Sequence, residues 1–191
     1  MNKKIKIIAR CFEEEIASIL DKQFNVETIS TSKFATERIN QQVLTLRPKG
    51  IGAQIECDYL LIGLNHISER LGKKFRNTDR KFKIIDIPHY LEEEDFSTDL
   101  EDDVVIGEPA SNKFLTDIGI KDIEVVILLV DDLKKTILIL NEIRELNKSC
   151  KIISRVFSED MAQIISKKPF DAIPISSSKE TIDWLREKRL I

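Results

Sequence analysis

The sequence predicts an α/β fold in which repeated βαβ units build a doubly wound parallel sheet. From Cys57 onward, short apolar runs alternate with helical patterns, a glycine follows the first run, and an acid follows the second. The first run, 59–62, ends at Gly63, and a helical apolar pattern begins four to five residues later. The second run, 82–85, ends in Asp86, at the spacing where a dinucleotide-binding fold places its ribose-binding acid. These features favour a Rossmann-like unit.

Six strands and their connecting helices follow from the alternation of patterns. The strands are predicted at 58–63, 82–86, 103–107, 124–130, 150–156 and 172–176. The helices are predicted at 65–77, 111–118, 132–147, 159–167 and 178–188. This order calls for parallel strands joined by right-handed crossovers.

The chain also contains an internal repeat. Residues 8–19 are similar to 153–164 at an offset of 145, and residues 29–33 are similar to 175–179 at an offset of 146. Each copy has the pattern strand, helix, strand, helix. We therefore expect 1–45 to be the C-terminal part of a preceding unit, 46–56 to be a linker, and 57–191 to be a complete second domain. Two parallel strands cannot bury both faces, so either the chain is the C-terminal part of a longer duplicated protein or 1–45 dock on another subunit.

Composition excludes several classes of protein. Of 191 residues, 42% are hydrophobic and 33% are charged, which suits a globular domain with a solvated surface. Thirty basic and 33 acidic side chains give a net charge of −3, which argues against a nucleic-acid partner. The apolar runs are too short to span a bilayer. Three cysteines without metal or redox spacing indicate buried thiols in a reducing, cytoplasmic compartment.

No catalytic constellation is evident in the sequence. His66 and His89 are the only histidines, and neither belongs to a nucleophile motif. The most acidic segment begins with four carboxylates that are candidate ligands for a hard cation such as calcium: Glu92, Glu93, Glu94 and Asp95. The other interpretation of this segment is a solvated acidic surface.

From about residue 57 to 182 the chain resembles the TrkA-N or RCK domains, the cytoplasmic modules that regulate potassium channels and potassium uptake systems. The resemblance is carried by an ordered set of segments: 61–64, 84–86, 104–108, 114–120, 126–132 and 153–155. It implies an adenine nucleotide or NAD as the class of ligand. By position, the implied ligand-binding residues are Gly63, Asn65, Ser68, Asp86, Gly107, Glu108 and Asp131, with Arg155 as a phosphate or interface partner.

The glycine turn departs from the family pattern. The motif G-x-G-x-x-G requires glycine at 63, 65 and 68, whereas this chain has Gly63, Asn65 and Ser68. A side chain at 65 fills the space where a pyrophosphate approaches the backbone. The identity of the ligand therefore stays open.

The resemblance implies a regulatory, non-enzymatic module that senses a ligand and rearranges paired modules. The implied partners are a second copy, in a homodimer or higher oligomer, and a membrane-embedded potassium pore in the same or another chain. One alternative is a structural assembly module whose crevice binds nothing. Another is a nucleotide-dependent oxidoreductase, which would need an intact glycine turn and a substrate domain. The apolar stripes of the helix at 33–44 and of the helix bearing Trp184 fit packing on their own sheet or on a partner subunit.

Overall fold

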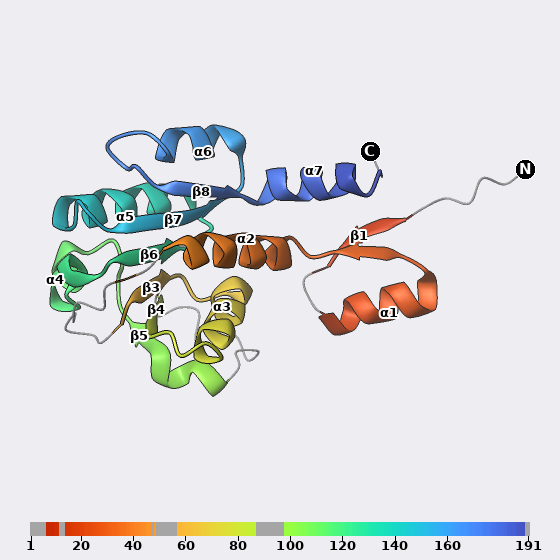
Figure 1. The fold of residues 1–191 in the computed structure, drawn as a ribbon, viewed down its shortest axis with the longest axis horizontal. Helices are drawn as coiled ribbons and strands as arrows, with labels where there is room; N and C mark the ends of the chain where they lie inside the picture. The colour runs from red at the N-terminus through yellow and green to blue at the C-terminus, as the bar shows by residue number, and fades with distance from the viewer. Residues whose placement is uncertain (1–6, 12–13, 47, 49–56, 87–97, 190–191) are drawn as a thin grey trace, which may run out of the picture.

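The computed structural model describes residues 7–11, 14–46, 48, 57–86 and 98–189 (Figure 1). Its centre is a six-stranded parallel sheet with the order β5-β4-β3-β6-β7-β8. The strands are β3 (Tyr59–Ile62), β4 (Phe82–Asp86), β5 (Val104–Ile106), β6 (Val125–Leu128), β7 (Lys151–Val156) and β8 (Ile173–Ser176). All six predicted strands are confirmed, with each end within two residues of its prediction.

Helices cover both faces of this sheet, because its central strands are apolar on both sides. Leu60 and Ile62 of β3 belong to one buried cluster, and Tyr59 and Leu61 belong to the other. The first cluster is closed by α4 (Asn112–Asp117), α5 (Leu133–Leu146) and α6 (Glu159–Ile165). The second is closed by α2 (Thr31–Thr45) and α3 (His66–Arg76). Two short 3-10 helices, η1 (Thr98–Asp103) and η2 (Ile120–Asp122), complete the connections.

The order of the strands creates a switch point at β3. Leu61 of β3 lies opposite Ile84 of β4 on one side and Ile127 of β6 on the other. The chain runs outward from β3 to β5 and then returns to β6 on the opposite side of β3. Connections that leave a parallel sheet in opposite directions open a crevice at the carboxyl ends of the strands, where such folds bind ligands.

The N-terminal residues form a small lobe at one end of the molecule (Figure 1). It consists of β1 (Ile8–Arg10), α1 (Glu14–Phe24) and β2 (Glu27–Ile29), with β1 parallel to β2. This lobe has the same element order as β7, α6 and β8, as the sequence repeat predicts. Both copies also have a residue in the left-handed conformation two positions before their second strand. Asn25 before β2 has a φ of 51°, and Asp171 before β8 has a φ of 47°.

Helix α2 connects this lobe to the main sheet. Its residues Ala35, Ile39 and Val43 are fully buried in the cluster that includes β3 and α3. Helix α7 (Ser177–Glu187) packs alongside α2, where the rings of Phe34 and Trp184 lie 5.6 Å apart. The helix predicted at 33–44 therefore packs on the sheet of its own chain.

Candidate functional site

The predicted crevice is present at the carboxyl ends of the central strands. It is a cavity of about 210 Å³ at the ends of β3, β4 and β6 and the start of α5. Nine residues line it: Gly63, Leu64, Asn65, Asp86, Leu129, Val130, Asp131, Asp132 and Lys135. Four of the eight residues proposed from the sequence are thus brought together in one cavity.

Gly63 forms the floor of the turn between β3 and α3. Its φ of 108° is a conformation that side chains rarely adopt. A Cβ atom at this position would lie 3.2 Å from the carbonyl carbon of Leu129 and 3.3 Å from the nitrogen of Val130. Glycine is therefore required here both by the backbone conformation and by the close approach of the chain after β6.

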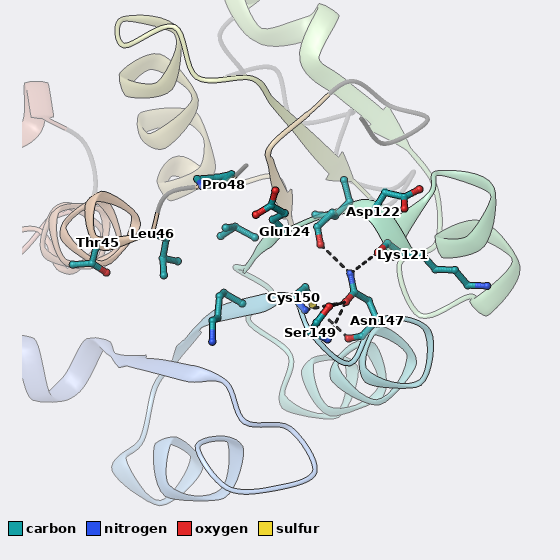
Figure 2. A pocket seen from close by; sticks show the side chains of 12 residues that line it. Thr45, Leu46, Pro48, Lys121, Asp122, Glu124, Asn147, Ser149 and Cys150 are labelled. Carbon is teal, nitrogen blue, oxygen red and sulfur yellow. Dashed lines mark hydrogen bonds between the residues drawn. The ribbon is translucent and has the colours of Figure 1, made fainter. Parts of the chain in front are cut away.

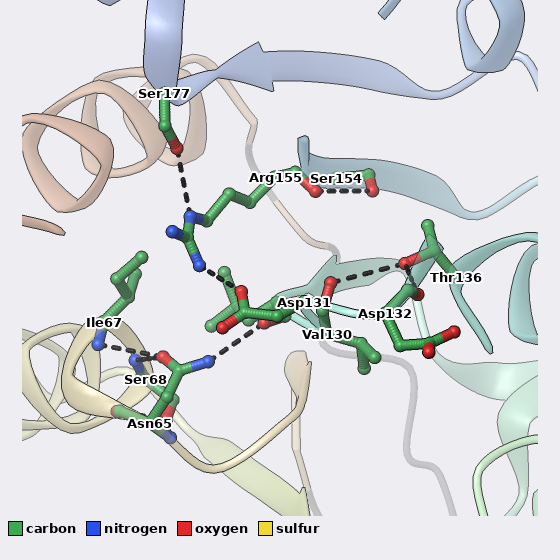
Figure 3. A network of polar contacts seen from close by, with 11 residues as sticks. Asn65, Ile67, Ser68, Val130, Asp131, Asp132, Thr136, Ser154, Arg155 and Ser177 are labelled. Carbon is green, nitrogen blue, oxygen red and sulfur yellow. Dashed lines mark hydrogen bonds and ion pairs between the residues drawn. The ribbon is translucent and has the colours of Figure 1, made fainter. Parts of the chain in front are cut away.

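Asn65 and Ser68 form a capping box at the start of α3 (Figure 3). The Oδ1 atom of Asn65 accepts hydrogen bonds from the backbone N–H of Ile67 at 2.9 Å and of Ser68 at 3.2 Å. The backbone N–H of Asn65 donates to Oγ of Ser68 at 2.8 Å. The Nδ2 atom of Asn65 donates to the carbonyl of Leu129 at 2.9 Å. The backbone N–H groups of Asn65, Ile67 and Ser68 are therefore satisfied from within the chain.

Asp86 ends β4 and lines the cavity with only 1% of its surface exposed. The backbone carbonyl of Asp86 accepts a hydrogen bond at 2.9 Å from the N–H of Gly107, just after β5. A side chain at Gly107 would overlap the ring of Phe114. The carboxylate of Glu108 accepts from the N–H of Ala110 at 3.2 Å. Gly107 and Glu108 thus shape the neighbouring loop and are not among the residues that line the cavity.

Arg155 links the crevice to α7 (Figure 3). Its guanidinium forms an ion pair with Asp131, and its Nε donates to Oγ of Ser177 at 3.0 Å. Its Cζ lies 4.6 Å from the ring centroid of Phe157. Burial lowers the pKa of Arg155, Asp131 acts in the opposite direction, and the nearby Arg10 lowers it further. Arg155 lies behind Asp131 and does not line the cavity.

The charges around the cavity are mainly negative. Three aspartates, Asp86, Asp131 and Asp132, line it together with one lysine, Lys135. Asp132 also caps α5, since its Oδ1 accepts from the N–H of Lys135 at 2.7 Å. Carboxylates accept hydrogen bonds from hydroxyl groups, so this arrangement suits a ligand that carries hydroxyls. The sequence analysis missed Asp132 and Lys135, although an Asp-Asp pair after a strand and a lysine in the next helical turn were visible.

A second cavity, of about 470 Å³, lies at the amino ends of β6 and β7 (Figure 2). It is bordered by the end of α2, the residues around η2 and the start of β7. Asn147 forms one wall, and its Nδ2 donates to the carbonyls of Ile120 at 2.8 Å and Ile123 at 2.9 Å. Its Oδ1 accepts from the N–H of Cys150 at 2.9 Å. These bonds cap the end of α5 and give Asn147 a structural role that the sequence analysis missed.

The other residues considered from the sequence do not join the crevice. The acidic candidates Glu92, Glu93, Glu94 and Asp95, together with His89, lie outside the described residues. His66 is exposed on the first turn of α3. Within the described ranges, no group of three or more His, Cys, Asp or Glu side chains is placed to hold a metal ion. Among those same ranges, no helix has the length and apolar character needed to cross a membrane.

Solved structures share the fold of this chain. The GsuK channel has a TM-score of 0.71 at 18% identity, and the match covers 97% of this chain and 46% of that one. The TrkA-N domain of the inner membrane protein YbaL from Escherichia coli has a TM-score of 0.57 at 18% identity, with 69% and 96% covered. The Kef C-terminal domain of Shewanella denitrificans, in an AMP-bound form, has a TM-score of 0.54 at 14% identity, with 69% and 79% covered.

The chain thus spans less than half the length of the GsuK channel. No curated protein is similar enough in sequence to count as a relative. The family model for the TrkA-N domain matches residues 59–175, from the first strand of the main sheet to β8. This range includes the glycine turn, the acid that ends β4 and the arginine of β7, so the chain belongs to the TrkA-N domain family.

Proposed function

We propose that this chain is a cytoplasmic regulatory module that senses a small ligand and controls a potassium channel or potassium uptake system. Its membership of the TrkA-N family supports this proposal. So does its likeness in fold to the GsuK channel and to a Kef C-terminal domain. In this proposal its role is regulatory. The crevice combines carboxylates with one lysine, and no serine, threonine, cysteine or histidine is among the described residues that line it.

The observation that carries the proposal is the position of Arg155. Its guanidinium binds Asp131, which lines the cavity, and Ser177, which is the first residue of α7. Helix α7 lies along α2, and α2 leads to the N-terminal lobe. A ligand that engages the carboxylate of Asp131 changes the partners of Arg155 and thereby the contact that orients α7.

Ligand binding acts in this proposal by a shift of population. A ligand stabilises whichever arrangement of the modules it binds more tightly, by its difference in affinity for the two arrangements. In our proposal Gly63, Asn65, Asp86 and Asp131 contact the ligand. Four further residues support this site or pass on the change: Ser68, Gly107, Glu108 and Arg155.

We further propose that residues 1–45 are the C-terminal part of a preceding unit, that 46–56 form a linker, and that 57–191 form the second unit. The exposure of Ile7 supports this division. Ile7 lies one residue before the repeat and is 54% exposed, whereas Ile152, at the same offset of 145, is 1% exposed beneath the helices of the complete unit. The partners we propose are further copies of the chain, in a homodimer or higher oligomer, and a membrane-embedded potassium pore.

The test follows a distance across the junction of α2 and α7. Spin labels are placed on cysteines at the exposed positions Lys33 and Lys188, because the three native cysteines are buried. A ligand that raises the melting temperature, from a panel of adenosine, AMP, ADP, ATP and NAD, is expected to change the distance in the parent chain but not in Arg155→Met. Arg186→Met, at an exposed arginine of α7, is the control.

Binding without any change in distance would overturn this mechanism. The link to potassium is tested by rubidium influx into the host cell. Cells carrying Arg155→Met are expected to lose the response of influx to the ligand, whereas cells carrying Arg186→Met keep it. Equal influx in the two strains would overturn the potassium-related role.

The second candidate function is a structural assembly module whose crevice binds nothing. The capping box of Asn65 and Ser68 favours it, because backbone donors that bind phosphate in this fold are satisfied internally. This candidate predicts no change in melting temperature across the whole ligand panel. It also predicts that the variant Asp86→Asn retains assembly and potassium control.

A further inference from the structure

The start of α3 is the position at which this fold binds a phosphate. In dinucleotide-binding turns the phosphate receives the N–H groups of the first helical turn, and glycines allow it to approach the backbone. In this chain the N–H groups of Ile67 and Ser68 point to Oδ1 of Asn65 at 2.9 and 3.2 Å. A side-chain carbonyl oxygen thus occupies the position of a phosphate oxygen.

The carboxamide of Asn65 is held from the opposite side as well. Its Nδ2 donates to the carbonyl of Leu129, just after β6, at 2.9 Å. Ser68, which is fully buried, accepts from the backbone N–H of Asn65 at 2.8 Å. Rotating the side chain away would break bonds to both neighbouring elements at once (Figure 3). The side chain is therefore a fixed part of the turn.

The electrostatics of the crevice also oppose a phosphate. Asp86, Asp131 and Asp132 line the cavity, and Lys135 is the one cationic side chain among the described residues that line it. The nearby cation Arg155 is 7% exposed and is already bound to Asp131 and Ser177. A phosphate placed here would share the crevice with three carboxylates, of which Asp86 is 1% exposed. Repulsion by Asp86 is the strongest of the three, because Asp131 and Asp132 are exposed and screened by water.

The remaining space suits a smaller ligand with an apolar part and hydroxyl groups. The cavity of about 210 Å³ is smaller than the roughly 300–1,000 Å³ of ordinary ligand pockets. Half-buried Val130 lines it beside the carboxylates, together with Leu64 and Leu129, which are 6% and 0% exposed. Asp86 ends β4, where this fold places the acid that binds the two hydroxyls of a ribose.

We infer that Asn65 permanently occupies the phosphate position of the crevice, so that the ligand is a nucleoside without a phosphate and not a dinucleotide. This inference rests on the proposed sensing role and specifies its ligand class. In this arrangement Asp86 binds the ribose hydroxyls, and the nucleobase packs on Val130 and on the backbone of Leu64 and Leu129, whose side chains are buried. The residues of this chain therefore do not fit NAD, although the fold is one that binds it.

Calorimetric titration of the full chain with adenosine, AMP, ADP and NAD tests the inference. Adenosine is expected to bind at least about tenfold more tightly than ADP or NAD. The variant Asn65→Gly opens the turn and keeps the helix start acceptable, since glycine is tolerated as a cap. We expect it to bind ADP at least about tenfold more tightly than the parent chain does.

Two further variants complete the design. In the parent chain Oγ of Ser158 caps α6 by accepting from the N–H of Met161 at 3.3 Å. The control variant Ser158→Gly removes this cap and is expected to leave the order of ligand affinities unchanged. Asp86→Asn is expected to weaken adenosine binding at least about tenfold. Circular dichroism of each variant verifies that it is folded before titration.

Three results would each overturn the inference. They are ADP or NAD binding to the parent chain as tightly as adenosine, no gain of ADP affinity in Asn65→Gly, and no binding of adenosine. These results are distinct from a failure of the proposed function. If adenosine binds without changing the distance between α2 and α7, only the sensing role is contradicted. If a ligand of another class changes this distance, only the assignment of a nucleoside is contradicted.

Discussion

The carboxylate of Asp131, whose side chain is 62% exposed, forms an ion pair with the guanidinium of Arg155, whose side chain is 7% exposed. Asp131 therefore supplies the counterion of a charge that is almost completely removed from water. The variant Asp131→Asn keeps the shape of this side chain and removes its charge. We expect it to lower the free energy of unfolding by about 1–3 kcal/mol, because a buried cation loses its charged partner.

Urea unfolding measures this effect. The neighbouring Asp132→Asn is the control, since asparagine caps a helix about as well as aspartate does and Asp132 caps α5. We expect this control to change stability by less than about 0.5 kcal/mol. Equal losses in the two variants would show that Arg155 does not depend on Asp131.

Replacing Gly63 by alanine tests the turn below the crevice. Its backbone has a φ of 108°, and a Cβ atom would lie only 3.2 Å from the carbonyl carbon of Leu129, so a methyl group has no relaxed position here. We expect Gly63→Ala to cost about 1–3 kcal/mol of stability. Asp79→Gly, at a residue with a φ of 52°, is expected to act in the opposite direction or have no effect. Chemical unfolding measures the free energy of unfolding of both variants. A Gly63→Ala variant as stable as the parent chain would contradict the inference that a side chain at this position is strained.

The main sheet was predictable because each of its strands is a short apolar run with a distinct end. Tyr59–Ile62 and Val125–Leu128 are buried on both faces, so they form continuous apolar runs bounded by Gly63 and by Asp131. The shared strand-helix pattern of the two repeat copies was predictable from serines at matching positions. Serines before each final helix marked its start, and Ser30 and Ser176 accept from Lys33 and Lys179 at 3.3 Å each.

The details of the site were less predictable because they depend on contacts between distant residues. The sequence placed Asn65 in the crevice, but its bond to Leu129 joins residues 64 positions apart. Glu108 follows β5 as predicted, yet its carboxylate accepts from Ala110 in its own loop. Local patterns indicate which strand end a residue occupies, whereas the partner of its side chain is fixed only when the sheet has formed.

Asn147 is expected to be one of the most sensitive polar residues in the chain. It is 6% exposed, donates to three carbonyls around η2 and accepts from the N–H of Cys150. Asn147→Ala leaves these groups without their partner, and we expect a loss of about 2–4 kcal/mol. Asn147→Asp is expected to be at least as destabilised at neutral pH, because a carboxylate would face those carbonyls.

The control for this pair is Asn141→Ala, an exposed position on the same helix. We expect it to stay within about 0.5 kcal/mol of the parent chain. Thermal and urea unfolding compare the variants. A loss in Asn147→Ala as small as that in Asn141→Ala would contradict the structural role of the Asn147 cap.

The three cysteines are free and buried, as the sequence predicted, and Cys57 has a consequence for alkaline stability. Burial raises the pKa of Cys57 from 9.0 to about 12, and Asp58 acts in the same direction. Above pH 9 the unfolded chain therefore ionises this thiol while the folded chain keeps its proton. The contribution of this thiol to the free energy of unfolding is fully present below its pKa in the unfolded chain. It is lost as the pH rises toward the pKa of the thiol in the folded chain.

From about pH 8 to about pH 10.5 we expect Cys57 to account for a loss of about 2 kcal/mol. Over the same pH range, the free energy of unfolding of Cys57→Ala is expected to decrease by about 2 kcal/mol less than that of the parent chain. This difference does not depend on the stability of the variant at the lower pH. Urea unfolding at both pH values gives the two differences. Parallel losses in parent and variant would show that the thiol ionises as readily in the folded chain as in the unfolded chain.

Ile7 and Ile152 each directly precede one copy of the repeat but differ in exposure, at 54% and 1%. In the isolated chain we expect Ile152→Ala to cost about 2–4 kcal/mol and Ile7→Ala to cost less than about 0.5 kcal/mol. If residues 1–45 complete a preceding unit, the amides of β1 become protected from hydrogen exchange when that unit is present, and Ile7→Ala then costs as much as Ile152→Ala. A large cost for Ile7→Ala in the isolated chain would instead mean that the N-terminal lobe needs no further partner.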